Sequence, residues 1–135
     1  MATTLIKNGD LYDAEAHAFH PRHVLIEDGR IASLDSDQPD ADVVIDATDA
    51  YVTPGLIDLH CHIFNHPEQP SRLPADRIGV GQGVTCLLDT GSTGGDTLDE
   101  FREIVLETQA THTYALCNIG SPGKSGLQSG HAAKP

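Results

Sequence analysis

The sequence predicts an α/β protein in which a small β unit is followed by about three β-α units of a parallel sheet. Two observations carry this prediction. The first fifty residues hold short apolar runs separated by Asn-Gly and Asp-Gly pairs, which are typical of strands joined by tight turns. From residue 54 onward, apolar runs alternate with segments of helical character, which is the pattern of β-α units.

Strands of the β unit are expected at residues 4–7, 24–27, 31–34 and 43–46. We expect the first strand to end at Asn8-Gly9-Asp10. The pair Asp28-Gly29 lies between two apolar runs and therefore predicts a hairpin between the second and third strands.

Strands of the second part are expected at residues 56–62, 85–89 and 112–118. The run 85–89 is nearly continuously apolar, which favours a parallel strand covered on both faces, and we expect a loop over 90–95. A sheet of three parallel strands keeps two bare edges and cannot close, so this part is predicted to be an incomplete structure.

Two helical segments are expected between these strands. Residues 75–82 predict a short helix that its glycines weaken. Thr97, with Glu100 three residues later, has the form of a capping box and predicts where the second helix begins. Its apolar residues recur at helical spacing: Leu98, Phe101, Ile104 and Val105.

The composition limits the partners and the location of the protein. Twenty acidic and eight basic residues give a net charge of −12, which disfavours nucleic acid and anionic membranes as partners. No apolar run is long enough to span a bilayer and the first residues do not resemble a secretory signal, so a cytoplasmic location is predicted. Cys61, Cys86 and Cys117 are widely spaced within apolar runs, so we expect three buried thiols.

The stretch Asp58-Leu59-His60-Cys61-His62 ends the first strand of the second part. Alternate side chains of a strand share a face, so Asp58, His60 and His62 are expected to point the same way. Two imidazoles at this spacing can bind one divalent metal ion, with Asp58 placed to orient a ligand. The spacing alone leaves open that the histidines bind no metal.

Residues 1 to 62 resemble the amidohydrolase superfamily, because IKNGDLYD, VLIEDGRIASL, VIDA and TPGLIDLHCH occur in its order. The stretches GVTCLLDTGSTGGDTLDEFRE and YALCNIGSPG resemble its dihydroorotase-like branch of amidohydrolases and deacetylases. The resemblance implies the N-terminal portion of a small β-sandwich over 1–53 and an incomplete (β/α)8 barrel of the TIM type over 54–123. It also implies a metal site that holds one or two divalent ions, with zinc expected. His60 and His62 are expected to ligate one of these ions. Residues 124–135 lack periodicity and are predicted to be a disordered tail.

The resemblance also implies what this chain does not contain. The family's bridging carboxylated lysine, two further histidines and the aspartate that acts as general base come from later strands. A complete barrel needs roughly 250 residues. We therefore expect a metal-dependent hydrolase of C–N bonds (amide or cyclic amide) or ester bonds in the full-length parent, with its general base beyond residue 135. The 135-residue fragment itself is predicted to be inactive.

Three further positions bear on the substrate. Asp89 and Asn118 end the second and third strands, on the side where barrel active sites lie, and are possible pocket residues. Dihydroorotases carry an arginine two residues after the second histidine, where this chain has Phe64. The resemblance therefore implies a small-molecule N-acyl or ester substrate rather than dihydroorotate.

Two other functions remain open from the sequence. One is a non-catalytic remnant that binds metal weakly through His60 and His62. The other is a homodimeric aspartic protease, in which Asp89-Thr90-Gly91 supplies one carboxylate of the dyad. The helical spacing directly after Gly91 disfavours the protease, which needs β-strands there. A homo-oligomeric state is possible under each of these interpretations.

Overall fold

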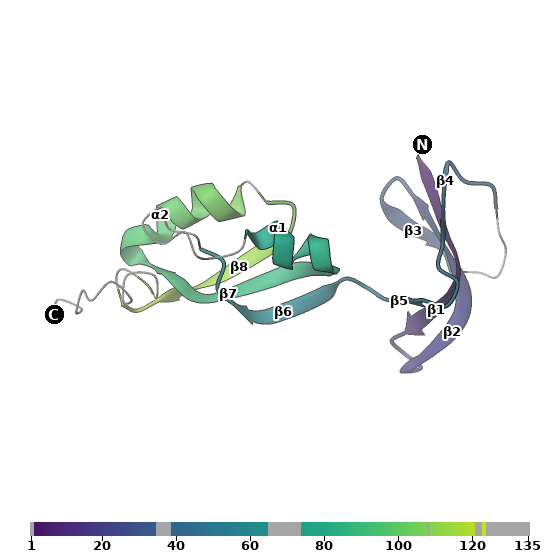
Figure 1. Ribbon diagram of the computed structural model, residues 1–135, viewed down its shortest axis with the longest axis horizontal. Coiled ribbons are helices and arrows are strands. Elements are labelled where there is room, and N and C mark those ends of the chain that lie inside the picture. The colour runs from purple at the N-terminus through teal and green to yellow at the C-terminus, as the bar shows by residue number, and fades with distance from the viewer. Residues whose placement is uncertain (1, 35–38, 65–73, 108, 121–122, 124–135) are drawn as a thin grey trace. The chain divides into compact units, whose positions relative to one another are not determined.

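The computed structural model describes residues 2–34, 39–64, 74–107, 109–120 and 123, and it confirms the α/β prediction. The chain forms two compact units, Met1–Pro54 and Gly55–Pro135 (Figure 1). The predicted tail at 124–135 lies outside the described residues. None of the described helices is long and apolar enough to cross a membrane.

The first unit is a five-stranded mixed sheet in the order β3-β2-β1-β4, with β5 also pairing with β1. Strand β1 lies antiparallel to β2 and parallel to both β4 and β5. The hairpin predicted at Asp28-Gly29 is confirmed: both residues have positive φ, which is the conformation of a two-residue turn whose twist matches its strands. The strands of this unit are β1 (Thr3–Asp13), β2 (Ala18–Glu27), β3 (Arg30–Ser33), β4 (Val43–Asp46) and β5 (Tyr51–Val52).

The predicted end of the first strand at Asn8-Gly9 is wrong, because β1 continues to Asp13. The register with β2 shifts between Ile6 and Gly9, and Asn8 adopts a φ of 65°. An Asn-Gly pair therefore forms a β-bulge here instead of a turn. Gly9 is required for a second reason, since a Cβ there would lie 2.6 Å from Val52 Cγ2.

The second unit contains the predicted parallel sheet, in the order β6-β7-β8 (Figure 1). Its strands are β6 (Leu56–Cys61), β7 (Val84–Gly94) and β8 (His112–Asn118). The third strand has the predicted bounds, but the loop expected from residue 90 is wrong because β7 runs on to Gly94. The register between β7 and β8 shifts between Thr90 and Gly94, so the extra residues form an irregular extension of the strand.

The first predicted helix is divided by a glycine. Helix α1 (Ala75–Ile78) ends at Gly79, and the 3-10 turn η1 (Val80–Gln82) follows it. A Cβ at Gly79 would lie 2.3 Å from Thr111 Oγ1 and 2.7 Å from the Ala75 carbonyl oxygen. Close packing against the segment before β8 therefore excludes any larger residue at this break.

The second helix begins where predicted, with a different cap. The 3-10 turn η2 (Gly95–Thr97) leads into α2 (Leu98–Phe101) and the π-helical turn η3 (Arg102–Leu106). The Thr97 side chain makes no capping bond to α2, so the predicted capping box with Glu100 is wrong. Its hydroxyl instead accepts the backbone N–H of Gly94 at 3.2 Å, one turn earlier.

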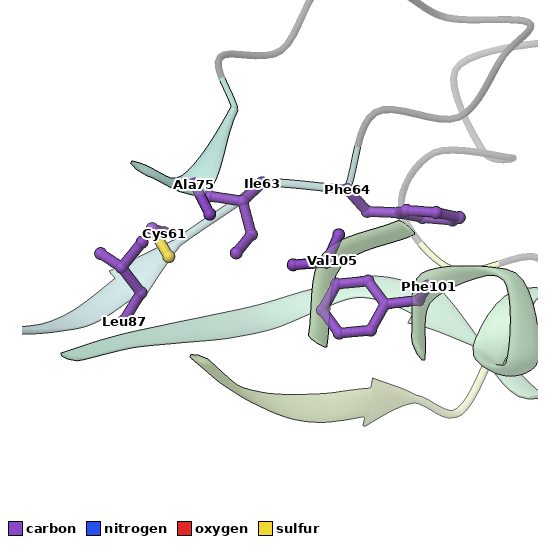
Figure 2. Packing of buried hydrophobic residues seen from close by; sticks show 7 residues of the cluster. All are labelled: Cys61, Ile63, Phe64, Ala75, Leu87, Phe101 and Val105. Carbon is purple, nitrogen blue, oxygen red and sulfur yellow. The ribbon is translucent and has the colours of Figure 1, made fainter. Parts of the chain in front are cut away.

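A buried apolar cluster lies between the helical segments and one face of the sheet (Figure 2). Phe64 and Phe101 are fully buried, and their rings meet edge to face with centroids 5.4 Å apart. The prediction that β7 is covered on both faces is wrong for this chain, because large residues of the neighbouring strands such as Ile57, Tyr114 and Leu116 are exposed. The cluster comprises Cys61, Ile63, Phe64, Ala75, Leu87, Phe101 and Val105.

The three cysteines are free thiols, but only Cys61 is buried. Cys86 is intermediate and Cys117 is exposed, so the expectation of three buried thiols is wrong. An apolar run places a cysteine on a strand, and the cover over each face of the sheet then decides its exposure.

Candidate metal centre

His60 and His62 lie at the carboxyl end of β6 with their side chains together. The ring centroids are 5.5 Å apart and the ring planes are perpendicular. His60 is exposed, whereas His62 is partly buried. Two imidazoles so close can approach a common ion, which is the arrangement that the His-x-His spacing predicted.

The pairing of β6 with β7 is irregular between Asp58 and the histidines. Asp58 pairs with Leu87 and Cys61 pairs with Asp89, so three steps along β6 match two along β7. A bulge of this kind turns the following residues and redirects their side chains. The Asp58 carboxylate also accepts the backbone N–H of His60 at 2.9 Å. The Asp58 carboxylate therefore holds the backbone of His60 within this bulge.

Asp89 is a fully buried carboxylate with both oxygens engaged by backbone donors. Oδ2 accepts the N–H of Ile63 at 2.8 Å, and Oδ1 accepts the N–H of Ser92 at 2.7 Å. Such charge-assisted bonds are stronger than bonds between neutral groups. One side chain thus connects the residue after His62 to the irregular end of β7.

Ser92 is a residue of this centre that the sequence reasoning missed. Its side chain is fully buried, and its Oγ lies 3.2 Å from Nδ1 of His62. The two residues are thirty positions apart in the sequence. The available signal was local: Ser92 follows Asp89 by three residues, a spacing at which an aspartate can accept a backbone N–H. That signal does not indicate a contact with His62.

Asn118 lies at the end of β8, on the same edge of the sheet. Its Nδ2 donates to the Gly91 carbonyl at 3.3 Å, and its Oδ1 accepts the N–H of Gly120 at 2.8 Å. Gly91 has a φ of 92°, and a Cβ there would lie 3.2 Å from the Asn118 amide nitrogen. The Asn118 side chain therefore links the turn after β8 to the end of β7 through two hydrogen bonds.

Cys61 lies between the two histidines in sequence, and its thiol is buried and hydrogen-bonded within the fold. Its Sγ donates to the Leu88 carbonyl at 3.3 Å. Burial, with smaller contributions from the charges of Asp89 and Asp58, raises the pKa of the thiol to about 11. The thiol is therefore directed to the β7 backbone, whereas the imidazoles of His60 and His62 face each other.

Within the described ranges, no group of three or more His, Cys, Asp or Glu side chains is placed to hold a metal ion. The imidazoles of His60 and His62 fit a divalent ion such as zinc as two members of a ligand set, because zinc sites use three or four protein ligands. A closed site therefore needs donors additional to these two.

The chain is similar to known hydrolases and deaminases. No family model matches it. A deacetylase of Agrobacterium fabrum is 40% identical over 98 residues, which cover 71% of this chain and 24% of that protein. A crystal structure of a dihydroorotase superposes with a TM-score of 0.79 at 32% identity, covering 91% of this chain and 33% of the other. A crystal structure of an adenine deaminase superposes with a TM-score of 0.71 at 29% identity, covering 92% of this chain and 32% of the deaminase. The chain thus spans about a quarter of the length of the two curated deacetylases that it matches.

Proposed function

The chain belongs to the dihydroorotase-like amidohydrolases, and from that premise we propose that it carries part of the metal centre of a hydrolase that cleaves amide, cyclic amide or ester bonds. The observation that supports this proposal is the pairing of His60 and His62 at the carboxyl end of β6, with ring centroids 5.5 Å apart. In barrels of parallel strands, active sites form at this end.

His60 and His62 are proposed to hold a divalent ion, with zinc as the first candidate. A divalent ion, when bound, supplies Lewis-acid activation of water and of the scissile carbonyl. The residues of this chain orient the ligands: Asp58 fixes the backbone of His60, and Asp89 fixes the backbone of Ile63 beside His62. The proton transfer during hydrolysis is assigned to an aspartate outside this chain.

The substrate is proposed to be a small N-acyl compound or an ester. Phe64, at the position where dihydroorotases carry an arginine, is fully buried and packs on Phe101. This position therefore offers no cation to a substrate carboxylate. The Agrobacterium fabrum relative is named a deacetylase, which also supports an acyl group as the part of the substrate that is released.

The two alternative functions would use different residues of this chain. An aspartic protease needs the Asp89 carboxylate to face its substrate, but this carboxylate is fully buried and both oxygens accept backbone N–H groups. A non-catalytic remnant would use His60 and His62 for weak metal binding alone. The geometry favours the hydrolase over the protease, and metal stoichiometry and activity separate the hydrolase from the remnant.

The 135-residue chain is expected to bind zinc weakly and to hydrolyse nothing, because two ligands leave a metal without a closed, oriented site. Titration of the purified chain with zinc, followed by calorimetry, tests the ligands. The His60→Ala and His62→Ala variants should each lose the binding that the wild-type chain shows. His112→Ala is a matched control, since this exposed histidine lies at the opposite end of the parallel sheet.

Equal zinc binding by the wild type and by both ligand variants would contradict the proposed centre. Tight binding of one zinc per chain would contradict the claim that the site is incomplete here. Hydrolysis of a panel of N-acetyl amino acids and aryl acetates, inhibited by a chelator, would show that the chain is active without further strands. Acid proteolysis blocked by pepstatin would instead favour the protease.

A further inference from the structure

We propose that Ser92 is a positioning residue for His62, and that its hydroxyl oxygen accepts the Nδ1–H of the imidazole so that Nε2 is the metal-binding nitrogen. The inference rests on the proposed function, because it concerns how the same metal centre is prepared. Ser92 Oγ lies 3.2 Å from His62 Nδ1, within hydrogen-bonding distance.

The position of Ser92 is set by the buried Asp89 carboxylate. One carboxylate oxygen holds the backbone of Ser92 at 2.7 Å, and the other holds the backbone of Ile63 at 2.8 Å. The serine that bonds His62 and the residue that follows His62 are therefore fixed to the same group. Because the Ser92 side chain is fully buried, its hydroxyl cannot turn to bulk solvent in place of the imidazole.

The direction of the hydrogen bond decides whether the imidazole is ready for a metal. A neutral imidazole has one N–H donor and one acceptor nitrogen. If Nδ1 carries the proton and donates it to Ser92, the lone pair of Nε2 is available to a cation. If the serine hydroxyl donates to Nδ1, the proton lies on Nε2 and must leave before a metal binds there. A histidine that ligates a metal usually donates its other N–H, which assigns the first arrangement to His62.

The first measurement is the tautomer of His62 in the metal-free wild-type chain. Long-range ¹H–¹⁵N spectra at about pH 8, above the ordinary imidazole pKa of about 6.5, distinguish a proton on Nδ1 from one on Nε2. The His62→Gln variant identifies the His62 signals by their loss. We expect the Nδ1–H form in the wild type. A wild-type His62 with its proton on Nε2 would overturn the proposal.

The second measurement compares zinc affinity among variants of the same strand. Ser92→Ala removes the hydroxyl, and we expect it to weaken zinc binding roughly 10- to 100-fold and to shift the tautomer toward Nε2–H. Ser92→Thr keeps a hydroxyl at this position, so the imidazole of His62 is expected to keep its wild-type tautomer. Thr93→Val is the control, since the equally buried Thr93 hydroxyl bonds Gly94 and Thr97 and not the histidine.

The outcomes separate this inference from the proposed function. If the wild-type chain binds zinc through His60 and His62, and folded Ser92→Ala binds it equally well, the role of Ser92 is wrong while the metal centre stands. If the wild type binds no zinc, the proposed function fails, whatever the tautomer. If Thr93→Val lowers affinity as much as Ser92→Ala, the effect is loss of packing and the positioning role is contradicted.

Discussion

Oδ2 of Asp89, on β7, lies 2.8 Å from the backbone nitrogen of Ile63, the residue that follows His62. The other oxygen of the same carboxylate accepts the N–H of Ser92. Two segments that are far apart in sequence are therefore fixed to one buried group at the carboxyl end of the parallel sheet. The geometry of the histidine pair depends on this connection as much as on β6 itself.

Asp89→Asn should destabilise the second unit by about 1–3 kcal/mol or more. The amide keeps only one acceptor oxygen, and its NH2 group then faces a backbone N–H, which leaves a buried donor without an acceptor. Urea unfolding measures the change. Asp96→Asn is the matched control, because this exposed carboxyl undergoes the same loss of charge and should change stability by less than about 0.5 kcal/mol. Equal effects of the two substitutions would show that the buried bonds contribute nothing.

Phe101→Ala should destabilise the second unit by about 3–5 kcal/mol, because it removes a fully buried ring from the cluster and its edge-to-face contact with Phe64. Leu98→Ala on the same helix is the control, since Leu98 is 42% exposed and little apolar contact is lost. Thermal unfolding followed by circular dichroism compares the two. The cluster assignment fails if Leu98→Ala is the more damaging substitution.

Thiol reactivity should follow the exposure of the three cysteines. Cys117 is exposed and should react first with an aromatic disulfide reagent, Cys86 next, and the buried Cys61 last. Stopped-flow absorbance should resolve these phases in the folded chain and a single fast phase in urea. Cys117→Ser should remove the fastest phase only. Persistence of that phase in the variant would contradict the described burial.

The first unit should lose stability in acid partly through Asp46. Hydrogen bonds from the side chains of Thr48 and Asn8, and from the Thr48 backbone, lower the pKa of Asp46 from 3.8 to about 2. Because the folded pKa lies below the unfolded value, this contribution is present above about pH 4 and is lost as the pH falls toward about 2. Asp46→Asn should therefore be less stable than wild type at neutral pH, with the difference shrinking below pH 4.

Urea unfolding at several pH values measures this difference. Thr48→Val, which removes one donor to the carboxylate, should show a smaller pH-dependent difference of the same sign. A gap between the wild type and Asp46→Asn that is unchanged down to about pH 2 would mean that the carboxylate is not stabilised in the fold.

The strand and helix positions were largely predictable because they depend on local patterns. Alternation of apolar runs, the Asp28-Gly29 turn and the bounds of β8 follow from side-chain periodicity and backbone preference. The errors occurred where a local signal has two solutions. Asn8-Gly9 can form a turn or a bulge, and pairing with β2 on one side and β4 and β5 on the other selected the bulge. Thr97 can cap a helix or bond the preceding turn, and the extended β7 selected the second.

The sequence by itself determined which two histidines form the candidate pair, because alternate side chains of a strand share a face. It also predicted that β6, β7 and β8 form a parallel sheet, whose strand order comes from the structure. Only the tertiary structure decided that Asp89 faces backbone donors, that Ser92 contacts His62 and that Phe64 is buried in the core. These contacts join residues about thirty positions apart through a bulge in β6 and an irregular end of β7, and such register shifts arise from pairing between strands, which no local pattern encodes.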